Sequence, residues 1–82
     1  MKLQKLRDLR EDHDLTQQKL AEYLHIRQAT YSEYESGKIS VPVEALIRLA
    51  EYYDVSVDYL LGRTDNPAPP KKIERTVKNG AR

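Results

Sequence analysis

Four residues carry side chains that can hydrogen-bond or pack against the edges of bases, and their spacing places them on one face of a helix: Gln28, Ala29, Ser32 and Glu33. The Gln28 amide offers a donor and an acceptor that match adenine N6 and N7, and the Ala29 methyl can contact a thymine methyl. The Ser32 hydroxyl can donate or accept, and the Glu33 carboxylate can accept from cytosine N4. The group predicts a surface that reads bases in the major groove of DNA.

Each of these residues also has a simpler interpretation. Gln28 could be a solvated residue at a helix N-terminus, although its position just after a predicted turn favours base contact. Ala29 is a good helix former, and Ser32 could be an ordinary surface residue. Glu33 could repel phosphates and so penalise wrong sequences, or it could be a solvated charge without a role. These alternatives stay open.

Further polar residues near this face are candidates for contacts with the phosphate backbone, which fix register rather than sequence. Backbone amides at the starts of the second and fourth predicted helices could add donors. Each residue alone is typical of an ordinary protein surface, and only the group as a whole indicates a surface that contacts phosphates. The candidates are Gln17, Arg27, Ser36, Lys38 and Ser40.

Five short helices are expected to position these side chains. Thr16 and Ser56 are typical of helix N-caps, Gly37 is typical of a left-handed C-cap, and Pro42 fits the first turn of the fourth helix. The helices are predicted over about residues 2–13, 17–24, 28–36, 43–53 and 57–61.

The core follows from the same periodicity. Tyr31 and Tyr34 are expected to pack inward rather than to stack on bases, whereas Val57 and Tyr59 could face a partner subunit. The fourth helix should bury one apolar stripe. That stripe comprises Val43, Leu46, Ile47, Ala50 and Tyr53.

Composition limits the class of protein. The 82 residues are enough for one small domain, and 33% of them are charged. The chain has no Cys, which excludes disulfides and fits a reducing cytoplasm, and its charged N-terminus does not resemble a signal peptide. No apolar run approaches the roughly 20 residues of a membrane span, so we expect no membrane association.

Charge is distributed unevenly. Residues 1–66 hold nine Lys/Arg and twelve Asp/Glu, whereas residues 67–82 hold five Lys/Arg and one Glu. We therefore divide the chain into a domain, residues 1–63, and a polar, proline-containing basic tail, residues 64–82. The tail could be an arm that adds sequence-independent affinity for phosphate, a segment that binds another chain, or a disordered stretch.

Catalysis is not expected. His13 and His25 lie twelve residues apart without a carboxylate arrangement that would complete a metal site. The sequence has no Ser–His–Asp grouping and no glycine-rich phosphate loop. We therefore predict a protein that is not an enzyme, with no metal, no cofactor and no small-molecule ligand.

A longer series of residues resembles one known family. It includes Leu15-Thr16-Gln17, Leu20-Ala21, Gly37-Lys38 and Val55-Ser56-Val57, in register and without gaps. The remaining members are Leu6, Leu9, Arg10, Leu24, Tyr31, Tyr34, Glu35, Leu46, Leu49, Ala50, Leu60 and Leu61. Together, residues 6–61 resemble the lambda-repressor-like, Cro-type helix-turn-helix regulators of phages and bacteria.

The resemblance implies an all-α, compact five-helix lambda-repressor-like domain with its third helix in the major groove. It implies that Gln17 packs on the phosphate backbone and braces the residue at Gln28. It also implies a partly buried ion pair between Arg10 and Glu35. A charged Glu among apolar positions of the third helix independently calls for a partner.

The chain departs from the family pattern at several turns. The family usually has Gly where this chain has Asp14, His25 and Asp54, and a left-handed non-Gly residue could cost about 1 kcal/mol. Arg27 replaces the usual Ser or Thr cap of the third helix, and Val41-Pro42 alters the approach to the fourth. These departures bear on loop geometry rather than on the fold.

The leading hypothesis is a cytoplasmic, bacterial or phage-encoded transcriptional regulator that binds double-stranded DNA. It would act as a repressor and a homodimer, reading a pseudo-palindromic operator with two half-sites about 34 Å apart. The alternative is a protein-interaction module on the same fold, antitoxin-like or an adaptor. Its motivation is the net charge of −3 over residues 1–66, together with Glu33 on the proposed reading face.

Overall fold

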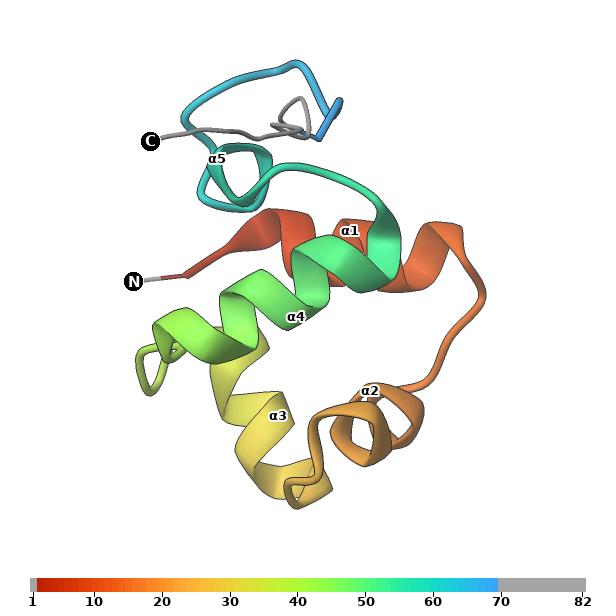
Figure 1. The fold of residues 1–82 in the computed structure, drawn as a ribbon. Coiled ribbons are helices and arrows are strands. Elements are labelled where there is room, and N and C mark those ends of the chain that lie inside the picture. The colour runs from red at the N-terminus through yellow and green to blue at the C-terminus, as the bar shows by residue number, and fades with distance from the viewer. Residues whose placement is uncertain (1, 70–82) are drawn as a thin grey trace, which may run out of the picture.

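Five helices make up the computed structural model, which describes residues 2–69. α2 and α3 lie side by side at one end of the domain, and α5 lies at the other end, above α4 (Figure 1). The all-α, five-helix architecture predicted from the sequence is confirmed, and no strand occurs within residues 2–69. The helices are α1 (Gln4–Asp12), α2 (Gln17–Leu24), α3 (Gln28–Ser36), α4 (Val43–Tyr53) and α5 (Val57–Leu60).

Capping residues set three of the helix ends. The Thr16 hydroxyl accepts a hydrogen bond from the Lys19 amide at 3.1 Å, and the Ser56 hydroxyl accepts one from the Tyr59 amide at 3.0 Å. Gly37 ends α3 in the left-handed conformation, with φ +81°. These caps supply partners for backbone groups that have none within the helix.

Other helix ends differ slightly from the prediction. α1 begins at Gln4 rather than near residue 2, because its N-cap, Leu3, has no side-chain acceptor for the free amides. Pro42 is the N-cap of α4, with ψ 150°, and therefore precedes the first turn instead of occupying it. α5 ends one residue early, and Leu61 is its C-cap.

Three residues other than glycine adopt positive φ angles, each just after a helix. Asp14 has φ 54°, His25 has φ 60° and Asp54 has φ 56°. These are the positions at which the family resemblance implied left-handed turns. The chain therefore carries three strained turns that a glycine would relieve.

The core lies between the five helices. Leu6, Leu20, Leu49 and Leu60 are fully buried, as is Tyr31, and Tyr34 is nearly so. The predicted stripe of α4 is wrong at two positions, because Val43 is 70% exposed and Ile47 is 44% exposed. The buried face of α4 is instead Leu46, Leu49, Ala50 and Tyr53.

A reciprocal pair of hydrogen bonds fixes α2 against α4. The Tyr23 hydroxyl donates to the Arg48 carbonyl at 2.9 Å, and Arg48 Nη2 donates to the Tyr23 carbonyl at 2.8 Å. The Arg48 guanidinium also lies 5.0 Å from the centre of the Tyr23 ring, within the range of a cation–π contact. This clamp sets where α2 sits, and α3 packs directly on α2.

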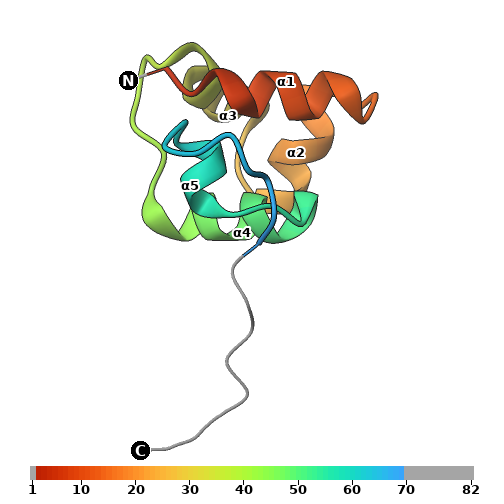
Figure 2. The same ribbon diagram turned by 90° about the horizontal axis from the view of Figure 1, so that it is seen from above.

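The segment after α5 folds back onto the domain (Figure 2). The Ser56 amide donates to the Pro67 carbonyl at 3.1 Å, and the Ala68 amide donates to Asn66 Oδ1 at 3.1 Å. Residues 64–69 therefore pack with the domain, although the sequence analysis assigned them to the tail. The rest of the predicted tail lies outside the described residues.

Candidate functional site

The outer side of α3 brings together the four residues proposed to read bases. Gln28 and Ala29 are exposed, and Ser32 and Glu33 are half-buried. Tyr31 and Tyr34 lie on the opposite side, in the core. The helix is therefore fixed by its inner aromatic residues and presents short polar and neutral side chains outward.

The N-terminal end of this surface has an uncapped helix start. Arg27 occupies the N-cap position with extended backbone, φ −73° and ψ 150°, and its side chain makes no capping hydrogen bond. Because the first amides of a helix point along its axis and carry partial positive charge, this end favours an anion. Arg27 itself is exposed and adds a full positive charge beside them.

The inner C-terminal part of α3 holds a nearly buried ion pair. Arg10 Nε donates to Glu35 Oε2 at 2.7 Å, and Arg10 Nη2 donates to Glu35 Oε1 at 3.2 Å. The exposed fractions of the two side chains are 14% and 6%. Arg10 Nη1 also donates to the Leu15 carbonyl at 3.0 Å, so one guanidinium connects α1, the turn before α2 and α3.

The pKa of Glu35 reflects two opposing effects. Burial alone would raise the pKa of this carboxyl, but the hydrogen bonds from Arg10, and a further one from Gln17, more than compensate. The pKa of Glu35 therefore lies below its ordinary value, and the side chain is ionised at neutral pH. The same hydrogen bond raises the pKa of Arg10, and burial raises that of Tyr31.

Gln17 has a different partner from the one that the resemblance implied. Its Nε2 donates to Glu35 Oε1 at 3.2 Å rather than bracing Gln28. The physical reason is that a nearly buried carboxylate needs several donors, and Arg10 alone does not fill all of its acceptor sites. The half-buried Gln17 side chain therefore belongs to the Glu35 network.

Three of the candidate phosphate-contacting residues lie at the end of α3 and on the loop that follows it. Lys38 is 73% exposed on its side chain, and its Nζ lies 3.7 Å from Glu33 Oε2. Ser36 and Ser40 are also exposed, and the Ser36 hydroxyl donates to the Glu33 carbonyl at 3.3 Å. This contact between Glu33 and Lys38, which was not predicted from the sequence, offsets the negative charge of Glu33 on this surface.

Two cations that the sequence analysis did not consider also lie beside α3. Lys2 and Arg7 line a surface notch together with Gln17, Ser32 and Ser36. No local sequence pattern predicts the notch, because residues 2–7 come close to α3 only in the folded chain. Helical spacing alone could not have found it.

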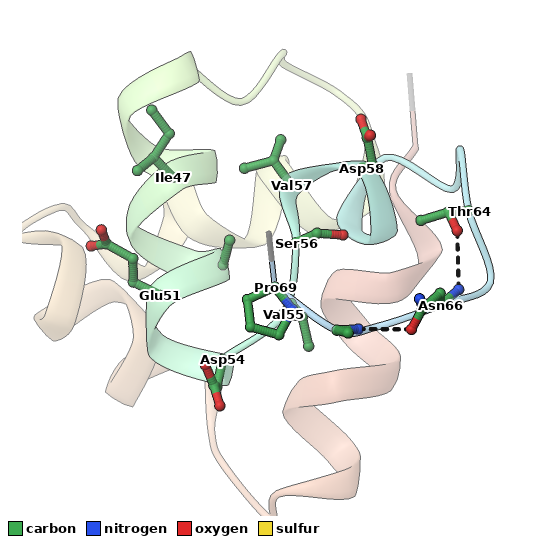
Figure 3. Close-up of a pocket in the computed structure, with 12 residues that line it drawn as sticks. Ile47, Glu51, Asp54, Val55, Ser56, Val57, Asp58, Thr64, Asn66 and Pro69 are labelled. Carbon is green, nitrogen blue, oxygen red and sulfur yellow. Dashed lines mark hydrogen bonds between the residues drawn. The ribbon is translucent and has the colours of Figure 1, made fainter. Parts of the chain in front are cut away.

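A second hollow lies at the opposite end of the domain, between α4, the start of α5 and residues 64–69 (Figure 3). Val57 lines this groove with Ile47, and three acidic residues surround them: Glu51, Asp54 and Asp58. Tyr59 lies elsewhere, with Lys5 Nζ 4.6 Å from the centre of its ring. The structure thus separates the two residues that were proposed together as a dimer contact.

Within residues 2–69, no group of three or more His, Asp or Glu residues could hold a metal ion, and His13 Nδ1 donates to the Leu9 carbonyl at 2.8 Å. In the same part of the chain, the longest apolar helix falls short of what crossing a bilayer requires.

The comparisons with known proteins agree with this geometry. A family model described as helix-turn-helix matches residues 6–60. The chain is 48% identical over 75 residues to the HTH-type transcriptional regulator YobD of Bacillus subtilis, covering 92% of this chain and 65% of YobD. It is 34% identical over 61 residues to the cryptic phage CTXphi transcriptional repressor RstR of Vibrio cholerae, covering 74% and 55%.

A solved structure is similar as well. The crystal structure of a transcriptional regulator from Listeria innocua has a TM-score of 0.67 and 38% sequence identity, over 70% of this chain and 53% of that one. The chain thus spans about half to two thirds of the length of these proteins. The resemblance drawn from residues 6–61 is confirmed.

Proposed function

The chain belongs to the helix-turn-helix family, and from this premise we propose that it regulates transcription by binding a specific sequence of double-stranded DNA. The observation that supports the proposal most directly is the outward face of α3. There, a Gln, an Ala and a Ser project from a helix whose other side is locked in the core. In this proposal α3 enters the major groove.

The proposed contacts divide into two kinds. Gln28 pairs with an adenine, Ala29 packs on a thymine methyl, and Ser32 and Glu33 contact neighbouring bases. Phosphate contacts then fix the position of α3 in the groove without specifying sequence. They come from Gln17, Arg27, Ser36, Lys38 and Ser40.

We further propose that the protein acts as a homodimer and as a repressor. The groove beside Val57 and Ile47 supports the dimer, because it exposes apolar side chains at the end of the domain that lies away from α3. A dimer joined at that end would present two α3 helices to two half-sites, about one helical turn apart. Sedimentation of wild type and Val57→Asp, with and without operator DNA, tests this arrangement.

The test of the proposed function is selection of bound duplexes from a random-sequence pool, followed by titration at about 150 mM salt. A regulator of this kind should bind the selected duplex at least about 10³-fold more tightly than a scrambled one. Gln28→Ala should relax the preference at one position in each half-site, by about 1–3 kcal/mol.

Gln4→Ala is the matched control for Gln28→Ala. It removes another exposed glutamine amide, one that donates to Asp8 on α1 and lies outside α3. Its sequence preference should equal that of wild type. A pool without enrichment, together with a protein partner that copurifies in stoichiometric amount, would favour the interaction module instead.

A further inference from the structure

We infer that Lys2 and Arg7 form, with the start of α2 and the end of α3, a binding site for one backbone phosphate of the DNA. This inference rests on the proposed function, because the phosphate belongs to the duplex that α3 reads. It adds a segment before the helix-turn-helix motif to the interface. It assigns this role to two residues outside the group of phosphate contacts proposed above.

The notch is lined by more positive than negative side chains. The notch has a volume of about 340 Å³ and opens to solvent beside α3. Its charged lining residues are Lys2, Arg7 and Arg10 against one carboxylate, Glu35. Because Arg10 already neutralises Glu35 through two hydrogen bonds, the charge of Lys2 and Arg7 is left to attract an anion.

The same notch also contains neutral hydrogen-bond donors. Ser32 and Ser36 are one helical turn apart on α3, so their hydroxyls lie on the same side of the helix. Gln17 lines the notch from the first turn of α2, a helix end whose free amides favour negative charge. Two cations, the Ser32 hydroxyl and the second N–H of the Gln17 amide can serve a phosphodiester oxygen pair, whereas the Ser36 hydroxyl must first release the Glu33 carbonyl.

Main-chain packing against Gly37 holds Lys2 in place. A side chain at Gly37 would bring its Cβ to 2.9 Å from both Lys2 Cα and Lys2 N. The main chain of Lys2 therefore packs directly on the glycine that ends α3. The main chain of Lys2 is thus held beside α3 before any DNA binds.

Arg7 has one competing partner, and the competition is weak. Its Nε lies 3.0 Å from Glu11 Oε2, but both side chains are more than half exposed. Exposed ion pairs of this kind are screened by water and salt and contribute little. A DNA phosphate can therefore recruit the guanidinium without breaking a buried contact.

The experiment measures how DNA affinity of the full chain depends on salt. Fluorescence anisotropy with a labelled random duplex of about two helical turns gives the slope of log K against log salt. Because both residues bind one phosphate, Lys2→Ala and Arg7→Ala should each lower the steepness of that slope, and the two together should lower it by about 0.9, the value for one lost phosphate contact. Binding to all sequences should weaken alike. Thermal melts check that both variants are folded.

Arg63→Ala is the matched control. The Arg63 side chain is more exposed than that of Arg7, 74% against 56%, and pairs with Asp58 in α5, at the end of the domain away from α3. Its removal should leave the slope unchanged. If wild type binds DNA and the double variant Lys2→Ala/Arg7→Ala retains the wild-type slope, the phosphate site is overturned.

A second measurement separates this inference from the proposed function. If wild type binds no duplex, the proposed function fails. Titration with inorganic phosphate then tests whether the notch binds an anion independently of DNA. Amide NMR shifts should concentrate at Arg7, Gln17 and Ser36, exceed those produced by chloride at equal ionic strength, and disappear in Arg7→Ala. Shifts that are absent or spread over the whole domain would overturn the site.

Discussion

The two sides of α3 differ in whether their polar groups are buried and hydrogen-bonded within the protein or exposed to solvent. On the inner side, Glu35 is nearly buried, and its carboxylate is held by Arg10 and Gln17. On the outer side, Gln28 is exposed and the helix begins at Arg27 without a side-chain cap. The inner residues hold the fold in place, and the outer ones leave hydrogen-bonding capacity available for a ligand. Substitutions on the inner side should therefore lower the stability of the fold, whereas those on the outer side should chiefly change DNA binding.

The strongest test of this division is Arg10→Met. It would leave the Glu35 carboxylate nearly buried without its cation, and loss of one partner from a buried pair typically costs about 3–5 kcal/mol. Chemical denaturation monitored by circular dichroism measures the free energy of unfolding. Arg63→Met removes an exposed pair and should cost less than about 1 kcal/mol. A loss of under about 0.5 kcal/mol for Arg10→Met would contradict the proposed division.

Acid should weaken the same inner network. The pKa of Glu35 is lower in the folded protein than its ordinary value, so its contribution is fully present above about pH 4.3. That contribution is lost as the pH falls through the lower folded pKa, because the unfolded chain then binds the proton more readily. Unfolding free energies measured between about pH 6 and pH 2 should fall over this window.

The double variant Arg10→Met/Glu35→Leu provides the comparison for acid sensitivity. It removes both charges together, so its stability should decline less steeply over the same pH range. Identical pH dependence in wild type and in the double variant would show that other carboxylates dominate acid unfolding.

On the outer side, Arg27→Ser should change stability and DNA binding in opposite directions. Serine at the N-cap can accept a hydrogen bond from the free amides of α3, which should stabilise the domain by about 0.5–1 kcal/mol. Loss of the positive charge should weaken binding to every duplex and reduce the salt slope by about 0.9. Denaturation and anisotropy of the same preparation test both effects, and equal or tighter DNA binding would remove Arg27 from the interface.

Gln28→Ala should have the smallest effect on stability. The side chain is exposed, and such surface substitutions usually change the free energy of unfolding by less than about 0.5 kcal/mol. The same variant should lose base discrimination, as set out for the selection experiment. A destabilisation above about 1 kcal/mol would show that Gln28 supports the fold, and the two sides of α3 would then not be separable.

Local sequence signals were enough to predict most of the fold. Thr16, Ser56 and Gly37 act on backbone groups within a few residues, so their roles could be inferred from the sequence. The stripe of α4 was harder, because two sets of positions fit the helical period. Only the packing of α4 decides that Leu49 is buried and that Val43 and Ile47 are not.

The contacts of the site depended more on long-range packing. The family resemblance implied the pairing of Arg10 with Glu35, whereas residue types alone indicated only that a charged Glu among apolar neighbours needs a partner. The partner of Gln17, the clamp between Tyr23 and Arg48 and the contact of Lys2 with Gly37 all join residues distant in sequence. Their geometry is set by how the helices pack, which periodicity and capping do not encode.

The packing of Lys2 against Gly37 has a practical consequence for anyone who handles this protein. Whatever is joined ahead of Lys2 starts beside the C-terminal end of α3, so an oligohistidine tag at that position adds bulk and titratable charge next to the proposed DNA surface. Affinities measured with an N-terminal tag would therefore partly report the tag, and cleaving it should precede any comparison of salt slopes.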